Sequence, residues 1–133
     1  MAPEIRFKPV LAKELQELLS TCRAFEGLGE EAFDLLANEA ERVFVPAGTH
    51  YLSHGGSGDA AEVIEHGRCI FHIPGRSDKI HVIELGRGEI VALATTLSGA
   101  TYGGDLYALR DSTLIKLPYN SKMVYFHNVI TPL

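Results

Sequence analysis

The stretch that decides the fold runs from Val45 to Arg68 and reads V-P-A-G-T-H-Y-L-S-H-G-G-S-G-D-A-A-E-V-I-E-H-G-R. Short apolar runs alternate in it with glycines, and a Gly-Asp turn is expected at Gly58-Asp59. Glycine serves where the backbone needs a positive φ or a close approach. The spacing therefore predicts tight corners between short strands, with the corner glycines at Gly48, Gly55, Gly58 and Gly67.

The same pattern continues on both sides of this stretch, and residues 88–111 repeat it from Gly88 onward. Evenly spaced short strands separated by Gly, Pro and Asp are typical of an antiparallel barrel or roll. We expect a mainly β fold with flanking helices, a jelly-roll-like double-stranded β-helix of about eight strands over residues 42–117. Strands are predicted at 42–45, 50–53, 61–66, 69–73, 79–85, 106–109 and 113–117.

Helices are expected at both ends of this roll. Apolar residues recur at helical spacing from Val10 to Cys22, and a second apolar face follows Gly29 and ends near Ala40. These two N-terminal helices occupy residues 10–40, and a C-terminal helix is predicted over 119–130 after Pro118. Residues 92–98, A-L-A-T-T-L-S, are interpreted as one or two helical turns inserted between strands. All 133 residues then form a single domain.

Composition narrows the classes of function. The net charge is −5 and the basic residues are scattered, so the chain alone lacks the basic face that binding to nucleic acid requires. No apolar run reaches the roughly 18 residues of a membrane span, and the first seven residues are no secretory signal. We therefore expect a soluble, cytoplasmic chain in which Cys22 and Cys69 are free thiols.

Catalysis and metal binding find little support. His50 and His54 lie about 13 Å apart if they share a strand, too far to share one ion. Ser57 stands in a turn before a strand, whereas a nucleophile elbow needs a following helix. Cys69 and His72 could serve as haem ligands by residue type only. We expect no metal, no cofactor and no enzyme activity, with the other histidines of the predicted strands on separate elements at His66, His72 and His81.

The corners together resemble those of the cyclic nucleotide-binding domain family. Pro46-Ala47-Gly48 matches the family's P-A-G, and Gly55 with Gly58-Asp59 matches its E-G-x-x-G-D, with His54 in place of the glutamate. Gly67-Arg68 matches the next corner, and residues 85–89, L-G-R-G-E, are similar to L-G-x-G-D. The resemblance covers nearly the whole chain and implies a regulatory or sensor domain.

The family's phosphate-binding cassette, G-D-x-x-G-E-L-A followed by R-[ST]-A, can be placed on this chain without gaps. In the family, the arginine pairs with the cyclic phosphate and the glutamate accepts from the ribose hydroxyl. Here Leu93 takes the position of the glutamate and Tyr102 that of the arginine, and neither replaces the lost contact. The candidate ligand-binding residues on this placement are Val91, Ala92, Leu93, Ala94, Tyr102 and Gly103.

Losing a buried charge-assisted contact costs ~2–5 kcal/mol, which predicts very weak or absent binding of cAMP and cGMP. Arg87 and Arg110 flank the cassette and could supply charge from another direction, although solvated corner positions are the favoured interpretation for both. Three functions stay open. One is a sensor whose pocket, lined by Leu93 and Tyr102, takes a more apolar ligand. The others are an interaction module with a vestigial pocket and a cyclic-nucleotide binder with a non-standard cassette.

The partners compatible with these functions are a small molecule and an effector domain or partner protein, and an oligomer is compatible as well. No long helix follows the predicted closing helix, so we expect either one domain of a larger protein or a free-standing remnant.

Overall fold

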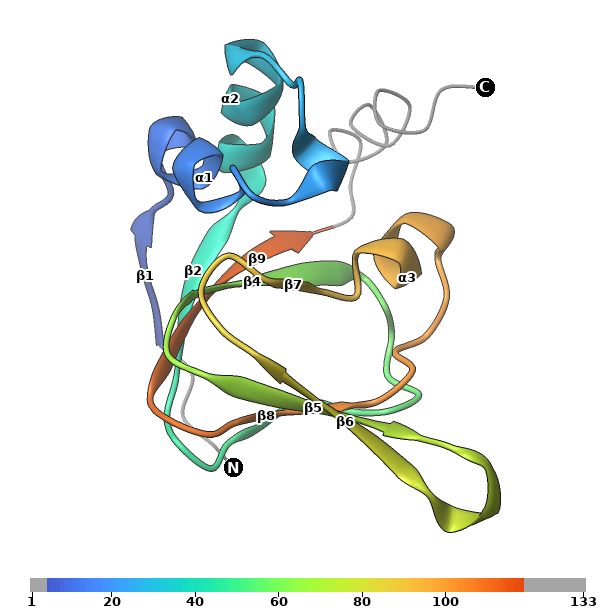
Figure 1. Cartoon of the computed structure of the whole chain (residues 1–133). Coiled ribbons are helices and arrows are strands. Elements are labelled where there is room, and N and C mark those ends of the chain that lie inside the picture. The colour runs from blue at the N-terminus through green and yellow to red at the C-terminus, as the bar shows by residue number, and fades with distance from the viewer. Residues whose placement is uncertain (1–4, 119–133) are drawn as a thin grey trace.

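Two antiparallel sheets face one another and two helices pack at one end of them in the computed structural model of the chain (Figure 1). The structure describes residues 5–118, apart from the side chains of residues 5–8, 24, 76, 94 and 97. The helices of this part are α1 (Ala12–Leu18), α2 (Glu30–Glu39) and α3 (Leu93–Ser98), with 3-10 turns η1 (Arg23–Phe25) and η2 (Arg76–Asp78). The strands are β1 (Ile5–Pro9), β2 (Glu41–Val45), β3 (His50–Leu52), β4 (Ala60–His66), β5 (Cys69–Pro74), β6 (Ile80–Leu85), β7 (Ile90–Val91), β8 (Asp105–Ala108) and β9 (Ser112–Pro118).

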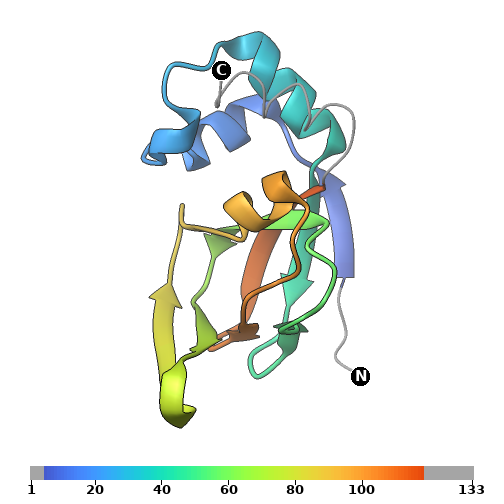
Figure 2. The ribbon, with the colours of Figure 1, turned by 90° about the vertical axis from the view of Figure 1, so that its right-hand side faces the viewer.

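The strand order is β1-β2-β9-β4-β7 in the first sheet and β3-β8-β5-β6 in the second. Without β1 at its edge, the first sheet has four strands like the second, which gives the eight strands of the predicted roll. The two N-terminal helices lie over one end of the roll, and α3 lies at the edge of the first sheet (Figures 1 and 2). The mainly β architecture with two N-terminal helices is confirmed; the C-terminal helix predicted over 119–130 lies outside the described residues.

The core has two parts, one on each side of the first sheet. Successive side chains of a strand point to opposite faces. Val63 of β4 accordingly packs in the cluster beneath the helices, and its neighbour Ile64 packs inside the roll. In β9, Ile115 and Leu114 divide in the same way. All four side chains are 0% exposed, so β4 and β9 are buried on both faces of this sheet.

The N-terminus differs from the prediction, because residues 5–9 form strand β1 where no strand was expected. This strand pairs antiparallel with β2, with Ile5 opposite Phe44. Pro9 ends β1, and the pairing register shifts just before it, since proline has no N–H to continue the ladder. The helix then starts at Ala12, two residues later than the predicted range.

Four of the predicted corner glycines are confirmed, and the fifth, Gly58, is required for a reason other than a turn. Gly48, Gly55, Gly67 and Gly88 have positive φ angles between 83° and 98°. Gly58 does not, and the Gly-Asp turn expected at Gly58-Asp59 is wrong, since the turn lies at His54-Gly55. A Cβ on Gly58 would collide with the carbonyl oxygen of Ala100. Gly58 is therefore required for a close approach of two backbone segments.

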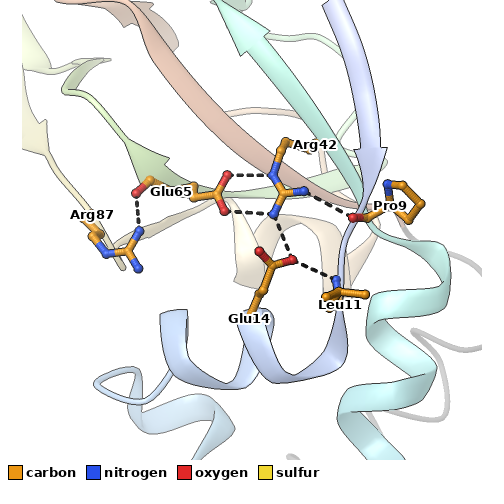
Figure 3. Close-up of polar contacts among 6 residues, drawn as sticks. All are labelled: Pro9, Leu11, Glu14, Arg42, Glu65 and Arg87. Atoms are coloured by element: carbon orange, nitrogen blue, oxygen red, sulfur yellow. Dashed lines mark hydrogen bonds and ion pairs between the residues drawn. The ribbon is translucent and has the colours of Figure 1, made fainter.

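A partly buried ion network fastens α1 to the roll (Figure 3). The guanidinium of Arg42, on β2, donates to both carboxylate oxygens of Glu65, on β4, at 2.8 and 2.9 Å. It also donates to Glu14 of α1 and to the carbonyl oxygen of Pro9, both at 3.2 Å. The backbone oxygen of Glu65 accepts from Arg87 at 2.6 Å, which extends the network to the β6–β7 turn.

No helix in the described part of the chain combines the length and the apolar character that crossing a membrane would require.

Candidate functional site

The candidate site lies where β7 passes into α3. The preceding turn at residues 86–89 is fixed to β4, because Gly88 N donates to Ile64 O at 2.8 Å and Ile64 N donates to Glu89 O at 2.9 Å. Ala92 then caps α3 with φ 67° and ψ 20°, a left-handed conformation that is uncommon outside glycine. The gapless placement puts Ala92 where the cyclic nucleotide-binding family has a glycine, which would adopt this backbone without strain.

A cavity of about 260 Å³ opens beside this turn. β5 contributes two of its lining residues, the start of α3 contributes three and the segment before β8 contributes one. None of these side chains is ionisable, so the cavity offers a ligand apolar surface, backbone groups and one hydroxyl. The lining residues are Phe71, Ile73, Ala92, Leu93, Thr95 and Gly103.

Tyr102 is not among the residues that line this cavity and belongs to the core of the roll, where it is 6% exposed. Its hydroxyl donates to the carbonyl oxygen of Ala60 at 2.8 Å. Burial, with a smaller contribution from the nearby Glu62 carboxylate, raises the pKa of Tyr102 to about 12. The prediction that Leu93 and Tyr102 line one pocket is therefore corrected. Leu93 lines the cavity, and Tyr102 is a core residue whose hydroxyl donates to the backbone.

The other predicted site residues divide between the cavity and the core. Ala92 and Gly103 line the cavity with Leu93, which is half-buried and also packs against the helical cluster. Val91 is buried inside the roll. Ala94 belongs to α3, and its side chain lies outside the described residues.

The two flanking arginines lie at exposed corners. Arg87 donates to the backbone of Glu65, and the backbone N–H of Arg110 donates to Arg68 O at 3.3 Å. Neither residue is among those that line the cavity. This arrangement agrees with the interpretation of both arginines as solvated corner residues.

Sequence reasoning missed three of the lining residues and one buried acid. Phe71 and Ile73 follow Cys69 at every second position of β5, so strand alternation could have assigned them to the inner face. Glu62 lies on the inward face of β4, is 1% exposed, and accepts from the Tyr51 hydroxyl at 3.2 Å. Its place within an apolar strand was a signal for a buried acid. Thr95, the third missed lining residue, carried no such signal.

Within residues 5–118, no three His, Cys, Asp or Glu side chains are grouped so that they could hold a metal ion. His50 instead contacts the Asp105 carboxylate, with 3.0 Å between Nε2 and Oδ1, and stacks on the ring of Tyr107 at a centroid distance of 4.5 Å.

Comparison with solved structures places this fold among cyclic nucleotide-binding domains. A cyclic nucleotide-binding domain from Methylobacillus flagellatus KT has a TM-score of 0.76 at 16% identity, over 96% of this chain and 78% of that one. The cAMP-bound PfPKA-R (141–441) has a TM-score of 0.76 at 20% identity, over 90% and 45%. The regulatory subunit of a cAMP-independent protein kinase A from Trypanosoma brucei has a TM-score of 0.69 at 18% identity, over 80% and 40%.

The chain thus spans less than half the length of the two kinase regulatory chains. No protein-family model matches the sequence, and no curated protein matches it.

Proposed function

We propose that this chain, which has the fold of cyclic nucleotide-binding domains, is a regulatory sensor domain whose cassette no longer holds cAMP or cGMP. The observation that carries the proposal is the cavity beside α3, which has no ionisable side chain in its lining. Tyr102 stands at the position of the cassette arginine and is bonded to Ala60 inside the roll. A cyclic phosphate would find no guanidinium to neutralise it.

The electrostatics of the roll add to this argument. The acid inside the roll is Glu62, which is 1% exposed and whose carboxylate raises the pKa of the neighbouring Tyr102. This carboxylate and the net charge of −5 of the whole chain both repel an anionic ligand inside the roll. Burying an unpaired charge is costly, so the described site disfavours the cyclic phosphate.

The trypanosome structures support the idea that this fold also occurs where cAMP is not the signal. That regulatory subunit belongs to a cAMP-independent kinase, and a mutant of it with three substitutions was solved with cAMP bound in the A site. One of the three substitutions introduces an arginine in place of a threonine. By analogy, we assign the proposed loss of cyclic-nucleotide binding in this chain to the missing arginine.

The ligand that fits the cavity is small and uncharged. The cavity has a volume of about 260 Å³, below the roughly 300–1,000 Å³ of sites for drug-sized ligands. Phe71, Ile73 and Leu93 supply apolar contact, and the Thr95 hydroxyl supplies one polar group. Binding there would bias the position of α3, and an effector segment or partner protein would receive that change.

Isothermal titration with cAMP and cGMP tests the first part of the proposal. We expect a dissociation constant above 1 mM for both nucleotides. A submillimolar dissociation constant for either would overturn this part of the proposal.

The second part is tested with indole, a small uncharged aromatic probe, by NMR of the Ile73 and Leu93 methyl groups. We expect saturable shifts with indole that disappear in Gly103→Leu, since a Cβ at Gly103 meets nothing within 4 Å and the side chain can extend into the cavity. If neither residue's methyl groups show saturable shifts, the sensor function is overturned. The interaction module is then the remaining function.

A further inference from the structure

Strand β6 forms an edge of the second sheet. Its only strand neighbour in residues 5–118 is β5, and the β5–β6 hairpin projects beyond the body of the roll (Figures 1 and 2). Three branched apolar side chains of β6 are exposed: Ile80 by 61%, Val82 by 58% and Ile83 by 45%. Long, apolar edge strands are uncommon in monomeric proteins, because they invite pairing with another strand.

The hydrogen bonds of the hairpin show which backbone groups point outward. Gly75 N donates to Lys79 O, and these two residues are opposite each other in the β5–β6 register. Hydrogen-bonded and non-hydrogen-bonded pairs alternate along an antiparallel ladder. The odd-numbered residues of β6 therefore bond to β5, and the N–H and C=O groups of Ile80, Val82 and Glu84 face the open edge.

An independent bond leads to the same assignment. On the other side of β5, Leu109 N donates to Arg68 O at 2.8 Å. The even-numbered residues of β5 thus face β8, and its odd-numbered residues face β6. The open edge of β6 consequently presents alternating donors and acceptors that an extended strand can pair with.

We propose that the partner of this edge is β6 of a second copy of the chain, paired antiparallel about a two-fold axis through His81. A two-fold axis that passes through His81, perpendicular to the sheet, pairs even-numbered residues of one β6 with even-numbered residues of the other. The outward N–H and C=O groups of the two copies therefore meet. With the axis at His81, Ile80 of each copy lies opposite Val82 of the other. Cross-strand pairs of branched apolar residues stabilise a sheet.

The charges near the strand are compatible with this register. The Glu84 carboxylate accepts from Arg68 at 2.7 Å within its own chain, and Asp78 lies in the turn η2 with φ 61°, outside the paired strand. Lys79 lies opposite Ile83, which its aliphatic stem can cover while its ammonium stays in water. A shift of two residues in either direction would leave a single apolar pair, Val82 with Val82 or Ile80 with Ile80, and would place Ile80 opposite Glu84 or Val82 opposite residue 78 of the turn η2. Apolar matching therefore selects the axis at His81.

The self-complementary sequence favours a second copy over an unrelated peptide. Any occupant of the edge must be an extended strand with branched apolar residues at alternate outward positions, and β6 itself has that pattern in Ile80 and Val82. Pairing of equivalent surfaces also closes after two copies and leaves no further edge for growth. Because only one strand per copy takes part, the interface is smaller than the standard ~1,600 Å², and we expect a dissociation constant in the micromolar range.

Sedimentation equilibrium of the full 133-residue chain from micromolar to millimolar concentration tests the dimer. We expect a monomer–dimer equilibrium that Val82→Lys weakens about tenfold or more, since it removes two apolar pairs per dimer. Val82→Thr keeps a β-branched residue and should weaken it less. Leu11→Lys, at a 62% exposed apolar position on another element, should leave it unchanged. A wild-type chain that stays monomeric to 1 mM would overturn the proposal, as would equal effects of Val82→Lys and Leu11→Lys.

Cross-linking tests the register. The His81 pair on the axis is a non-hydrogen-bonded pair, in which Cα atoms lie about 4.5 Å apart, within the range of a disulfide. In a Cys22→Ser background, His81→Cys should form a disulfide-linked dimer on mild oxidation, and the parent with Cys69 buried should not. Preferential cross-linking of Val82→Cys would overturn the axis at His81. The result of the cross-linking experiment does not depend on whether the cavity beside α3 binds any ligand.

Discussion

Arg42 and Glu65 form a two-pronged ion pair inside the structure, with Nε and Nη2 of the guanidinium 2.8 and 2.9 Å from the two carboxylate oxygens. The side chains are 6% and 12% exposed. Replacing one partner of a buried pair leaves the other charge uncompensated, at a cost of ~3–5 kcal/mol. We therefore expect Arg42→Met to lower the free energy of unfolding by about 3 kcal/mol in urea denaturation, with Arg42→Lys intermediate because it cannot make both bonds.

The matched control is the ion pair between Arg68 and Glu84, whose side chains are 36% and 54% exposed. Exposed pairs contribute ~0–1 kcal/mol, so Arg68→Met should change stability by less than 1 kcal/mol. Similar losses for Arg42→Met and Arg68→Met would show that burial does not set the strength of the Arg42 network.

Tyr102 should titrate later than ordinary tyrosines. Its pKa is raised to about 12, chiefly by burial, so the folded state favours the neutral phenol. The contribution of the neutral Tyr102 phenol to the free energy of unfolding is fully present below pH 10. It is lost as the pH rises from 10 towards 12. Absorbance titration at the tyrosinate band should show one late group that is absent in Tyr102→Phe, whereas Tyr107→Phe should keep it. A late group that survives Tyr102→Phe would contradict the assignment.

The sequence predicted the corners of the roll better than its site, for a physical reason. The φ requirement at Gly48 or Gly67 is a local property that a glycine reports directly. The direction of Tyr102 is not local: it follows from a hydrogen bond to Ala60, 42 residues earlier, in a segment without regular periodicity. Strand β1 was missed because its pairing with β2 is also long-range, and no strand was predicted before residue 42.

Gly58 should tolerate no side chain although its φ is not positive. A Cβ there would overlap the Ala100 carbonyl oxygen and come within 2.7 Å of Thr95 Cγ2, and Thr95 lines the cavity. Overpacking of this kind costs ~1–3 kcal/mol. Thermal unfolding of Gly58→Ala should show such a loss, and Gly103→Ala, where a Cβ meets nothing within 4 Å, should show almost none. Equal melting temperatures for the two variants would contradict the close approach.

The last prediction concerns restoring the missing charge to the cavity. Gly103 lines the cavity and has room for a side chain, whereas Tyr102 points into the core. We expect Leu93→Glu combined with Gly103→Arg to raise the affinity for cAMP by at least about tenfold in isothermal titration, because a guanidinium at position 103 can reach a bound phosphate. Leu93→Glu combined with Tyr102→Arg should give no such gain and should destabilise the fold, since the arginine would be directed toward Ala60 inside the roll. A gain from the variant at position 102 and none from the variant at 103 would place the phosphate on the opposite side of this segment. No gain from either variant, with both folded, would mean that the cassette cannot be placed on residues 88–106 without gaps.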